Sequence, residues 1–334
     1  MKTVCIVLLS MAGLGAQTTR APAPQKKNPA ADKPQILYRW DVQKSGVEDD
    51  LTGVSFVNLQ IGYAVGKNNT ILKTADGGNT WKRLLERQDH IDIHTVMFTS
   101  PADGWVGSGA LLHTSDGGES WQPAVPLPGP QGFGGGSMLG TSRIQLHVPT
   151  MGAGVSRSDD GGRTWQALGQ PPHNDYEAVF FADDRHGWVA GDYGRLASTT
   201  DGGATWKEQD LGFKPHLNKI QFVSPQVGWL LPQRGHQCGP LATVDGGQTW
   251  ISQYAGIAGY APLADMQFLD AQIGFLLAEG NRNELALATA NGGKSWRTIG
   301  SLQPYSTALS FPAADEGWVV GPKGYIVHYH KVVP

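Results

Sequence analysis

The chain has 334 residues, of which 40% are hydrophobic, enough apolar material for a sizeable core. Its formal net charge of -3 gives no indication of nucleic-acid binding, which normally needs a marked excess of Lys and Arg. The 45 Gly and 11 Trp residues are typical of a turn-rich, all-β chain.

The N-terminus resembles an export signal. Met1-Lys2 precede an apolar run over residues 4–14, and small residues follow at Gly15-Ala16. This pattern predicts a secretory signal peptide over residues 1–16. The run is shorter than the roughly 20 residues of a membrane helix, so we expect no stable membrane span after cleavage. The sequence thus favours an exported protein, periplasmic or extracellular.

Residues 17–35 are rich in Ala, Pro and Lys and predict a disordered linker, which leaves residues 36–334 for the folded domain. Cys238 is the one cysteine beyond the signal, so an internal disulfide is excluded there and the fold must be held by packing. Its Gln-Cys-Gly-Pro setting favours a tolerated loop thiol over a reactive or metal-binding one.

An eight-residue motif, Thr-Ala-Asp-Gly-Gly-Asn-Thr-Trp at residues 74–81, returns five times at steps of 40 to 46 residues. Repetition at this period predicts an array of stacked units. The glycines permit the positive φ of a tight turn, the acidic side chain can accept N–H groups of that turn, and the Trp can bury its ring between sheets. The acid or amide and the Trp of each copy are Asp76 and Trp81, Asp116 and Trp121, Asp160 and Trp165, Asp201 and Trp206, Asp245 and Trp250, and Asn291 and Trp296.

Asn291 retains the hydrogen-bond acceptor without the charge, which suits a turn-fastening role better than acid–base chemistry. Two further elements precede most copies: an apolar run ending in Phe, as in Val-Ser-Phe at residues 54–56, and a Gly-Trp pair, as in Gly187-Trp188. The eight-residue motif is identified as the Asp-box, or BNR, motif of β-propellers. The composite pattern, over about residues 37–333, resembles the photosystem II assembly and stability factor family.

The units predict an all-β, seven-bladed β-propeller with four-stranded blades. The third unit, residues 137–168, retains its Asp-box but lacks the Gly-Trp pair. The seventh, residues 307–331, lacks an Asp-box and a final strand. Trp40 precedes Val54 by 14 residues, much as Trp81 precedes Val96 by 15. We therefore expect residues 38–43 to supply the outer strand of the last blade and remove an open sheet edge.

Recognition is expected on the face opposite the Asp-boxes, which join the third and fourth strands of each blade. Loops between the second and third strands and loops between blades would build that face. Its candidate binding residues are His94, Tyr176, Tyr193, Arg195, His216, Arg234, Arg282, Tyr305 and Lys323. The resemblance also implies an arginine-rich surface, for which Arg195, Arg234, Arg282 and Lys323 are positional candidates.

The sequence predicts no metal and no cofactor. His90, His94, His173 and His216 come from different blade junctions and lack a paired ligand spacing. Catalysis is not expected either, although Asp-boxes also occur in sialidases and xyloglucanase-type glycosidases. The sialidase arginine motif F/Y-R-I-P is absent, and Tyr176 and Glu177 are adjacent in one strand and so face opposite ways. No spacing selects a glycosidase pair among Asp175, Asp192, Asp265 and Glu279.

We therefore expect an exported, non-catalytic propeller, a monomer, that acts as a protein-binding scaffold or assembly factor. The resemblance implies a photosystem II subunit as client in photosynthetic relatives. The alternative is a glycoside hydrolase or a carbohydrate-binding propeller that uses aromatic side chains such as Tyr193 and Tyr305.

Overall fold

The computed structural model describes residues 37–84, 91–108, 110–123, 139–140, 146–150, 154–173, 176–234, 239–253, 262–279 and 283–332. The predicted signal and linker, His90, Asp175, Cys238 and Arg282 lie outside these residues. Within them, no helix has the length and apolarity needed to cross a membrane.

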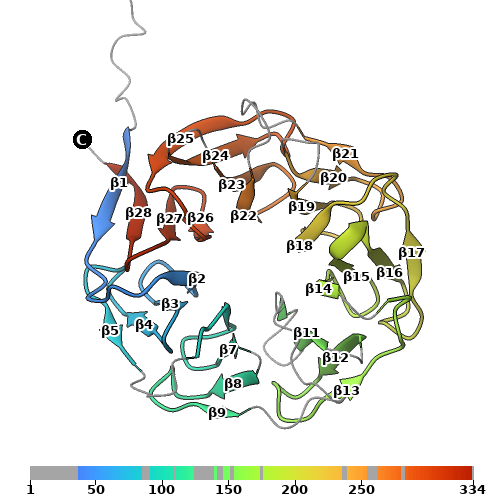
Figure 1. Cartoon of the computed structure of the whole chain (residues 1–334), viewed down its shortest axis with the longest axis horizontal. Helices are drawn as coiled ribbons and strands as arrows, with labels where there is room; N and C mark the ends of the chain where they lie inside the picture. Colours follow the sequence, from blue (N-terminus) through green and yellow to red (C-terminus); the bar gives the residue numbers. More distant parts are fainter. Residues whose placement is uncertain are drawn as a thin grey trace, which may run out of the picture.

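The strands form seven four-stranded antiparallel sheets arranged around a central axis (Figure 1). In each blade the chain runs from the innermost strand outward. Blades one to three contain β2 (Leu51–Phe56), β3 (Gly62–Gly66), β4 (Ile71–Thr74) and β5 (Lys82–Arg83); β6 (Thr95–Phe98), β7 (Gly104–Ser108), β8 (Ala110–Thr114) and β9 (Gln122–Pro123); and β10 (Leu139–Gly140), β11 (Leu146–Thr150), β12 (Gly154–Ser158) and β13 (Gln166–Ala167).

Blades four to six follow the same order. They contain β14 (Tyr176–Phe181), β15 (Gly187–Gly191), β16 (Leu196–Thr199) and β17 (Lys207–Gln209); β18 (His216–Phe222), β19 (Gly228–Arg234), β20 (Leu241–Thr243) and β21 (Ile251–Ser252); and β22 (Leu263–Phe268), β23 (Ile273–Glu279), β24 (Glu284–Ala290) and β25 (Arg297–Leu302). A 3-10 turn, η1 (Asp192–Gly194), joins β15 to β16. The predicted all-β propeller of four-stranded blades is confirmed.

The last blade is built from both ends of the chain. It contains β26 (Ala308–Ala313), β27 (Glu316–Val320) and β28 (Ile326–Val332), and its outer strand is β1 (Leu37–Gln43). β1 pairs antiparallel with β28 from Leu37 opposite Val332 to Gln43 opposite Ile326, and Figure 1 shows the two strands side by side. The predicted closure by the N-terminal strand is confirmed, and it leaves β28 without an open edge.

Flat stacks of aromatic rings join successive blades. In one blade, an aromatic residue follows the glycine that begins the second strand. Its ring lies face to face with the Phe that ends the innermost strand of the next blade. Trp188 lies on Phe222 and Trp229 on Phe268, in both cases with centroids 3.5 Å apart. The Asp-box Trp of the blade that carries this Phe meets the Phe ring edge-on, as Trp250 meets Phe222 with centroids 6.0 Å apart and an interplanar angle of 83°. Each such pair adds roughly 0.5–1.5 kcal/mol beyond the area it buries. The rings therefore form a three-ring unit across the blade junction.

The glycine before each stacked ring is needed because the Phe of the same blade lies against it. A Cβ on Gly228 would lie 2.4 Å from the Phe222 ring, closer than real carbon contacts allow. The same close approach, at 2.3–2.5 Å, occurs in six blades: Gly62 and Phe56, Gly104 and Phe98, Gly187 and Phe181, Gly228 and Phe222, Gly274 and Phe268, and Gly317 and Phe311. The apolar run ending in Phe and the Gly-aromatic pair thus form one packing unit in these six blades.

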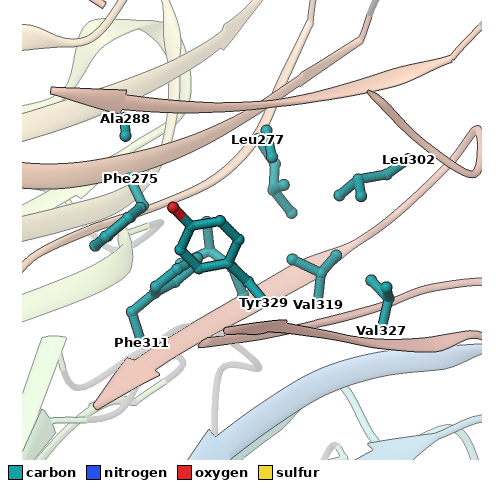
Figure 2. Packing of buried hydrophobic residues seen from close by; sticks show 10 residues of the cluster. Phe275, Leu277, Ala288, Leu302, Phe311, Val319, Val327 and Tyr329 are labelled. Atoms are coloured by element: carbon teal, nitrogen blue, oxygen red, sulfur yellow. The ribbon is translucent and has the colours of Figure 1, made fainter. Parts of the chain in front are cut away.

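Figure 2 shows this packing at the junction of blades six and seven, where Phe275 stacks on Phe311 with centroids 3.6 Å apart. Leu277, Val319 and Val327 fill the same layer, and all three are buried. In this blade no Asp-box supplies the edge-on ring. Trp40 of β1 supplies it instead, 6.5 Å from Phe311 at 79°.

β1 also contacts both neighbouring blades. The indole N–H of Trp40 donates to the carbonyl of Ile299 in blade six at 2.9 Å. On the other side, the Gln43 amide donates to the carbonyl of Gly77 at 3.0 Å and accepts from the Trp81 indole at 3.3 Å, both in blade one. The N-terminal strand therefore fastens three blades at the point where the ring closes.

Each Asp-box turn is held by its own side chains. In the fourth blade, Thr199 donates to Asp201 at 2.7 Å and accepts from the Gly203 N–H at 2.9 Å. Asp201 accepts from both the N–H and the hydroxyl of Thr205, at 2.9 and 2.6 Å. These bonds lower the pKa of Asp201 to about 2, the Thr205 hydroxyl contributing most. Asn291 makes the same backbone contact, from Ser295 N–H at 2.9 Å, so the motif is a turn fastener.

We predict that Trp40→Ala lowers the free energy of unfolding by about 3 kcal/mol, because it removes the edge-on ring and the bond to blade six. Urea unfolding followed by tryptophan fluorescence measures the change. Val42→Ala is the matched control, since Val42 lies on the same strand but is 72% exposed. Equal stability of the two variants would contradict a fastening role for β1.

Low pH should remove the stabilisation that the Asp-box carboxylates give to the fold, and an Asp→Asn variant can measure that loss. Because the folded-state pKa of Asp201 lies below its usual 3.8, its stabilisation is present above about pH 4 and is lost as pH falls through about 2. We expect Asp201→Asn to melt below the wild type at pH 6 and to converge with it near pH 2. A melting-temperature gap that stays constant between those pH values would show that the charge contributes nothing.

Candidate functional site

The antiparallel order of each blade places two loop sets at opposite ends. Asp-boxes join the third strand to the fourth, whereas the other end carries the loops between second and third strands and the loops between blades. We call this second end the loop face. Residues of the loop face line three cavities. One lies at the junction of blades four and five, one at the junction of blades six and seven, and one at the mouth of the central channel.

A cavity of about 310 Å³ lies where the first residues of the innermost strands meet. Asp265 lies in its wall and is only 7% exposed. This carboxylate forms an ion pair with Lys219 of blade five and accepts the N–H groups of Met266 at 2.8 Å and Leu309 at 2.9 Å. It therefore joins blades five, six and seven, and its lone pairs are engaged by the protein itself.

Hydroxyl groups continue these links around the cavity. Thr307 donates to the carbonyl of Leu51 at 2.7 Å, from blade seven to blade one, and Thr52 donates to the carbonyl of Ile93, from blade one to the segment entering blade two. His94 lines the same cavity with an exposed side chain. The polar groups of the channel mouth thus serve mainly to hold neighbouring blades in register.

One cluster of acids and a histidine lies at the junction of blades four and five. The ring of His216 contacts Asp192 through Nδ1 and lies 3.5 Å from Glu177 through Nε2. Burial raises the pKa of Glu177, and the nearby Asp192 raises it further against the opposing effect of His216. Potential ligand atoms of all three residues lie within 4.8 Å of one another, which within the described residues is the one group of three with metal-ligand chemistry.

Sequence reasoning named His216, Glu177 and Asp192 separately and gave no reason to group them. Glu177 is the second residue of β14 in blade four and Asp192 lies in the η1 turn, so only the fold brings them to His216 of blade five. The other candidate histidines do not join them: His173 pairs with Glu208 at 3.0 Å and His94 lies on the central cavity. Each ring nitrogen of His216 already faces a carboxylate.

Two predicted residues, Tyr193 and Arg195, lie together at a pocket of about 690 Å³ between blades four and five. The Arg195 guanidinium lies 5.7 Å from the centre of the Tyr193 ring, a cation–π contact. Tyr193 is 69% exposed and adopts a φ of 57°, which a non-glycine residue rarely does. Phe213 and Lys214 line the same pocket. Glu208 and Asp210 line it as well, so the loop face presents an exposed aromatic ring beside charges of both signs at this pocket.

The remaining candidates are distributed around the ring. Tyr305 is 73% exposed at a separate pocket between blades six and seven, and Lys323 lies in the β27–β28 loop, where its N–H donates to Asp50 at 3.1 Å. Arg234 ends β19 opposite His216. The prediction for Tyr176 was wrong: it is 6% exposed and packs in the core with Val155 and Phe181. It is the first residue of β14, and the first residues of β2 and β22, Leu51 and Leu263, are buried in the same way.

Sequence reasoning also missed Glu284. It is 3% exposed at the start of β24, opposite Glu279 at the end of β23, and both line the pocket that holds Tyr305. Burial raises the pKa of Glu284 to about 7, and the Glu279 charge adds to the shift. The spacing of the repeat alone gives no reason to place these two acids side by side, because their pairing is set by the strand register.

Known proteins resemble the chain along most of its length. The family described as Photosynthesis system II assembly factor YCF48 matches residues 33–173 and 164–250. The Photosystem II assembly lipoprotein Ycf48 of Synechococcus sp. (strain CC9902) is 28% identical over 229 residues, covering 66% of this chain and 61% of the relative. A lipoprotein of the same name from Prochlorococcus marinus is 23% identical over 336 residues, covering 69% of this chain and 95% of the relative. The chain thus spans less than two thirds of the Synechococcus relative.

Solved structures share the fold. The structure titled YCF48 bound to D1 peptide superposes with a TM-score of 0.67 at 20% identity, covering 87% of this chain and 96% of that one. The GH74 xyloglucanase from Xanthomonas campestris superposes with a TM-score of 0.64 at 16% identity, covering 87% and 53%. Such identities establish common architecture and leave function to the site. By its family match and its packed Asp-box blades, this chain belongs to the photosynthesis system II assembly factor YCF48 family.

Proposed function

We propose that this protein is a non-catalytic assembly or stability factor that holds a segment of a client protein on its loop face. The observation that carries the proposal is the pocket between blades four and five, where exposed Tyr193 lies beside Arg195. An exposed aromatic ring with a cation at its face is typical of protein-recognition surfaces, in which Tyr and Arg are enriched. A pocket of about 690 Å³ has room for several side chains of such a segment.

The acids of the channel support binding over hydrolysis. A glycosidase needs two carboxyl groups that face a substrate, roughly 5 to 10 Å apart. Asp265 is instead engaged by Lys219 and two backbone N–H groups, and Glu177 faces His216. Both acids line the central cavity, but each is already paired with a side chain of the protein, which favours a structural role over a catalytic pair.

A structural relative is titled as bound to a D1 peptide, and others are named photosystem II assembly lipoproteins. By analogy we propose that the client here is a membrane-protein segment that emerges on the exported side of a membrane, with a photosystem II subunit as the client if the host is photosynthetic. Export by the signal at residues 1–16, a linker over residues 17–35 and a periplasmic or extracellular location are parts of the same proposal.

The test is cross-linked affinity capture from the native host's membranes with the wild type and with Tyr193→Ala/Arg195→Ala. We expect the wild type to retain a defined membrane protein and the double variant to lose most of it, on the order of tenfold, because hot-spot side chains of this kind contribute about 1–2 kcal/mol. The matched control is Arg163→Ala/Val244→Ala, an exposed cation and an exposed apolar side chain in Asp-box turns.

Equal capture by both double variants would contradict recognition through the loop face. Xyloglucan and sialoside panels form the counter-test: turnover that disappears on mutation of an acid at the channel mouth would replace the scaffold function with hydrolysis. A melting temperature for each variant, measured beforehand, ensures that a lost client reflects the surface and not unfolding.

A further inference from the structure

The pocket between blades six and seven differs in charge from the one just described. Its volume is about 420 Å³, within the range of roughly 300–1,000 Å³ that small-ligand sites occupy. Pro262, Leu263 and Ala264 are its apolar lining residues. Glu279, Glu284 and Tyr305 are its titratable residues. It lies on the loop face, since Glu279 and Glu284 end the strands that a second-to-third-strand loop connects.

Both acidic side chains come from one cross-strand pair. Glu279 and Glu284 lie directly opposite each other on β23 and β24, so their side chains project to the same side of the sheet. Like charges in that position repel each other, and a carboxyl group buried as deeply as Glu284 needs either a positive partner or a proton. No Lys, Arg or His among the described residues forms an ion pair with either one.

The contact that Glu284 does make is with the rim of the pocket. The backbone N–H of Tyr305 hydrogen-bonds its carboxyl group, one donor for a group that can accept several. Tyr305 itself is 73% exposed, with a φ of 65° that a bulky residue seldom adopts. Its ring is therefore held at the entrance to an acidic hollow, where an aromatic face attracts cations.

We propose that this pocket binds a cationic side chain, the ammonium of a lysine or the guanidinium of an arginine, from the client segment on the loop face. The carboxylates would supply charge-assisted hydrogen bonds and Tyr305 the aromatic contact, an arrangement suited to organic cations. This inference rests on the proposed function and deepens it. The acidic pocket would be a second contact site for the client, beside the pocket with Tyr193 and Arg195. The client must then carry a positively charged side chain.

Binding should depend on pH because the carboxyl group of Glu284 changes its ionisation near neutral pH. Burial and the neighbouring Glu279 keep the pKa of Glu284 near 7, so its ionised fraction rises from about a tenth at pH 6 to about nine tenths at pH 8. A cation requires the ionised form. Its affinity should therefore increase by roughly tenfold over that interval, with release of the proton.

Isothermal titration calorimetry tests the proposal with capped Gly/Ser heptapeptides that carry one central arginine, lysine or glutamine. We expect the wild type to bind the arginine and lysine peptides and not the glutamine peptide. Glu284→Gln should weaken binding about tenfold at pH 8 and abolish the pH dependence, since the amide has the same shape without the charge. Glu279→Gln, at an exposed position, gives a second variant with an intact fold should Glu284→Gln melt early.

Glu119→Gln is the matched control, because Glu119 is an exposed acid in an Asp-box on the far face, and it should leave the affinity unchanged. The inference is overturned if the glutamine peptide binds equally well, if Glu119→Gln weakens binding as much as Glu284→Gln, or if Glu284 proves necessary for glycoside turnover instead. The peptides need no natural client. If they fail while client capture still depends on Tyr193 and Arg195, the inference falls and the proposed function stands.

Discussion

The fold depends on one repeated contact, the aromatic ring of one blade lying flat on the Phe of the next. Stacks such as Trp318 on Phe56, at 3.6 Å, and Tyr63 on Phe98, at 3.4 Å, bury large rings at the junctions where two sheets would otherwise splay apart. No blade can complete this contact alone, because its Phe needs a ring from the preceding blade. Stability is therefore shared around the ring, as in other repeat proteins.

Two places depart from that scheme. The third blade lacks the Gly-Trp element, and Trp105 of the second blade stacks on His113 of its own sheet, at 4.6 Å. At the closure, Trp40 arrives from the far end of the chain and meets Phe311 as an Asp-box Trp would. The edge-on contact thus keeps its geometry at the closure even though a different part of the chain supplies the ring.

Sequence predicted the parts of the molecule that short-range chemistry determines. The Asp-box network joins residues at most four positions apart, such as Thr199, Asp201 and Thr205, so composition and spacing are sufficient to infer it. The N-terminal strand was predictable because its Trp occupies the repeat's own spacing. Tyr176 was misjudged because it was assigned to a loop between blades, whereas it is the first, buried residue of β14. Glu284 and the grouping of acids around His216 were missed because their surroundings come from different strands or blades.

The division that we propose, between a face held by the Asp-box turns and a binding loop face, rests on this chemistry. Asp-box carboxylates direct their lone pairs to their own turns, and Asp265 directs its lone pairs to three blades, whereas Tyr193 and Tyr305 remain exposed on the loop face. Hydrogen–deuterium exchange of the protein with and without its captured client measures this division most directly. Protection confined to the loops around residues 192–195 and 303–307 is the predicted result. Protection of the Asp-box turns, with those loops unchanged, would contradict it.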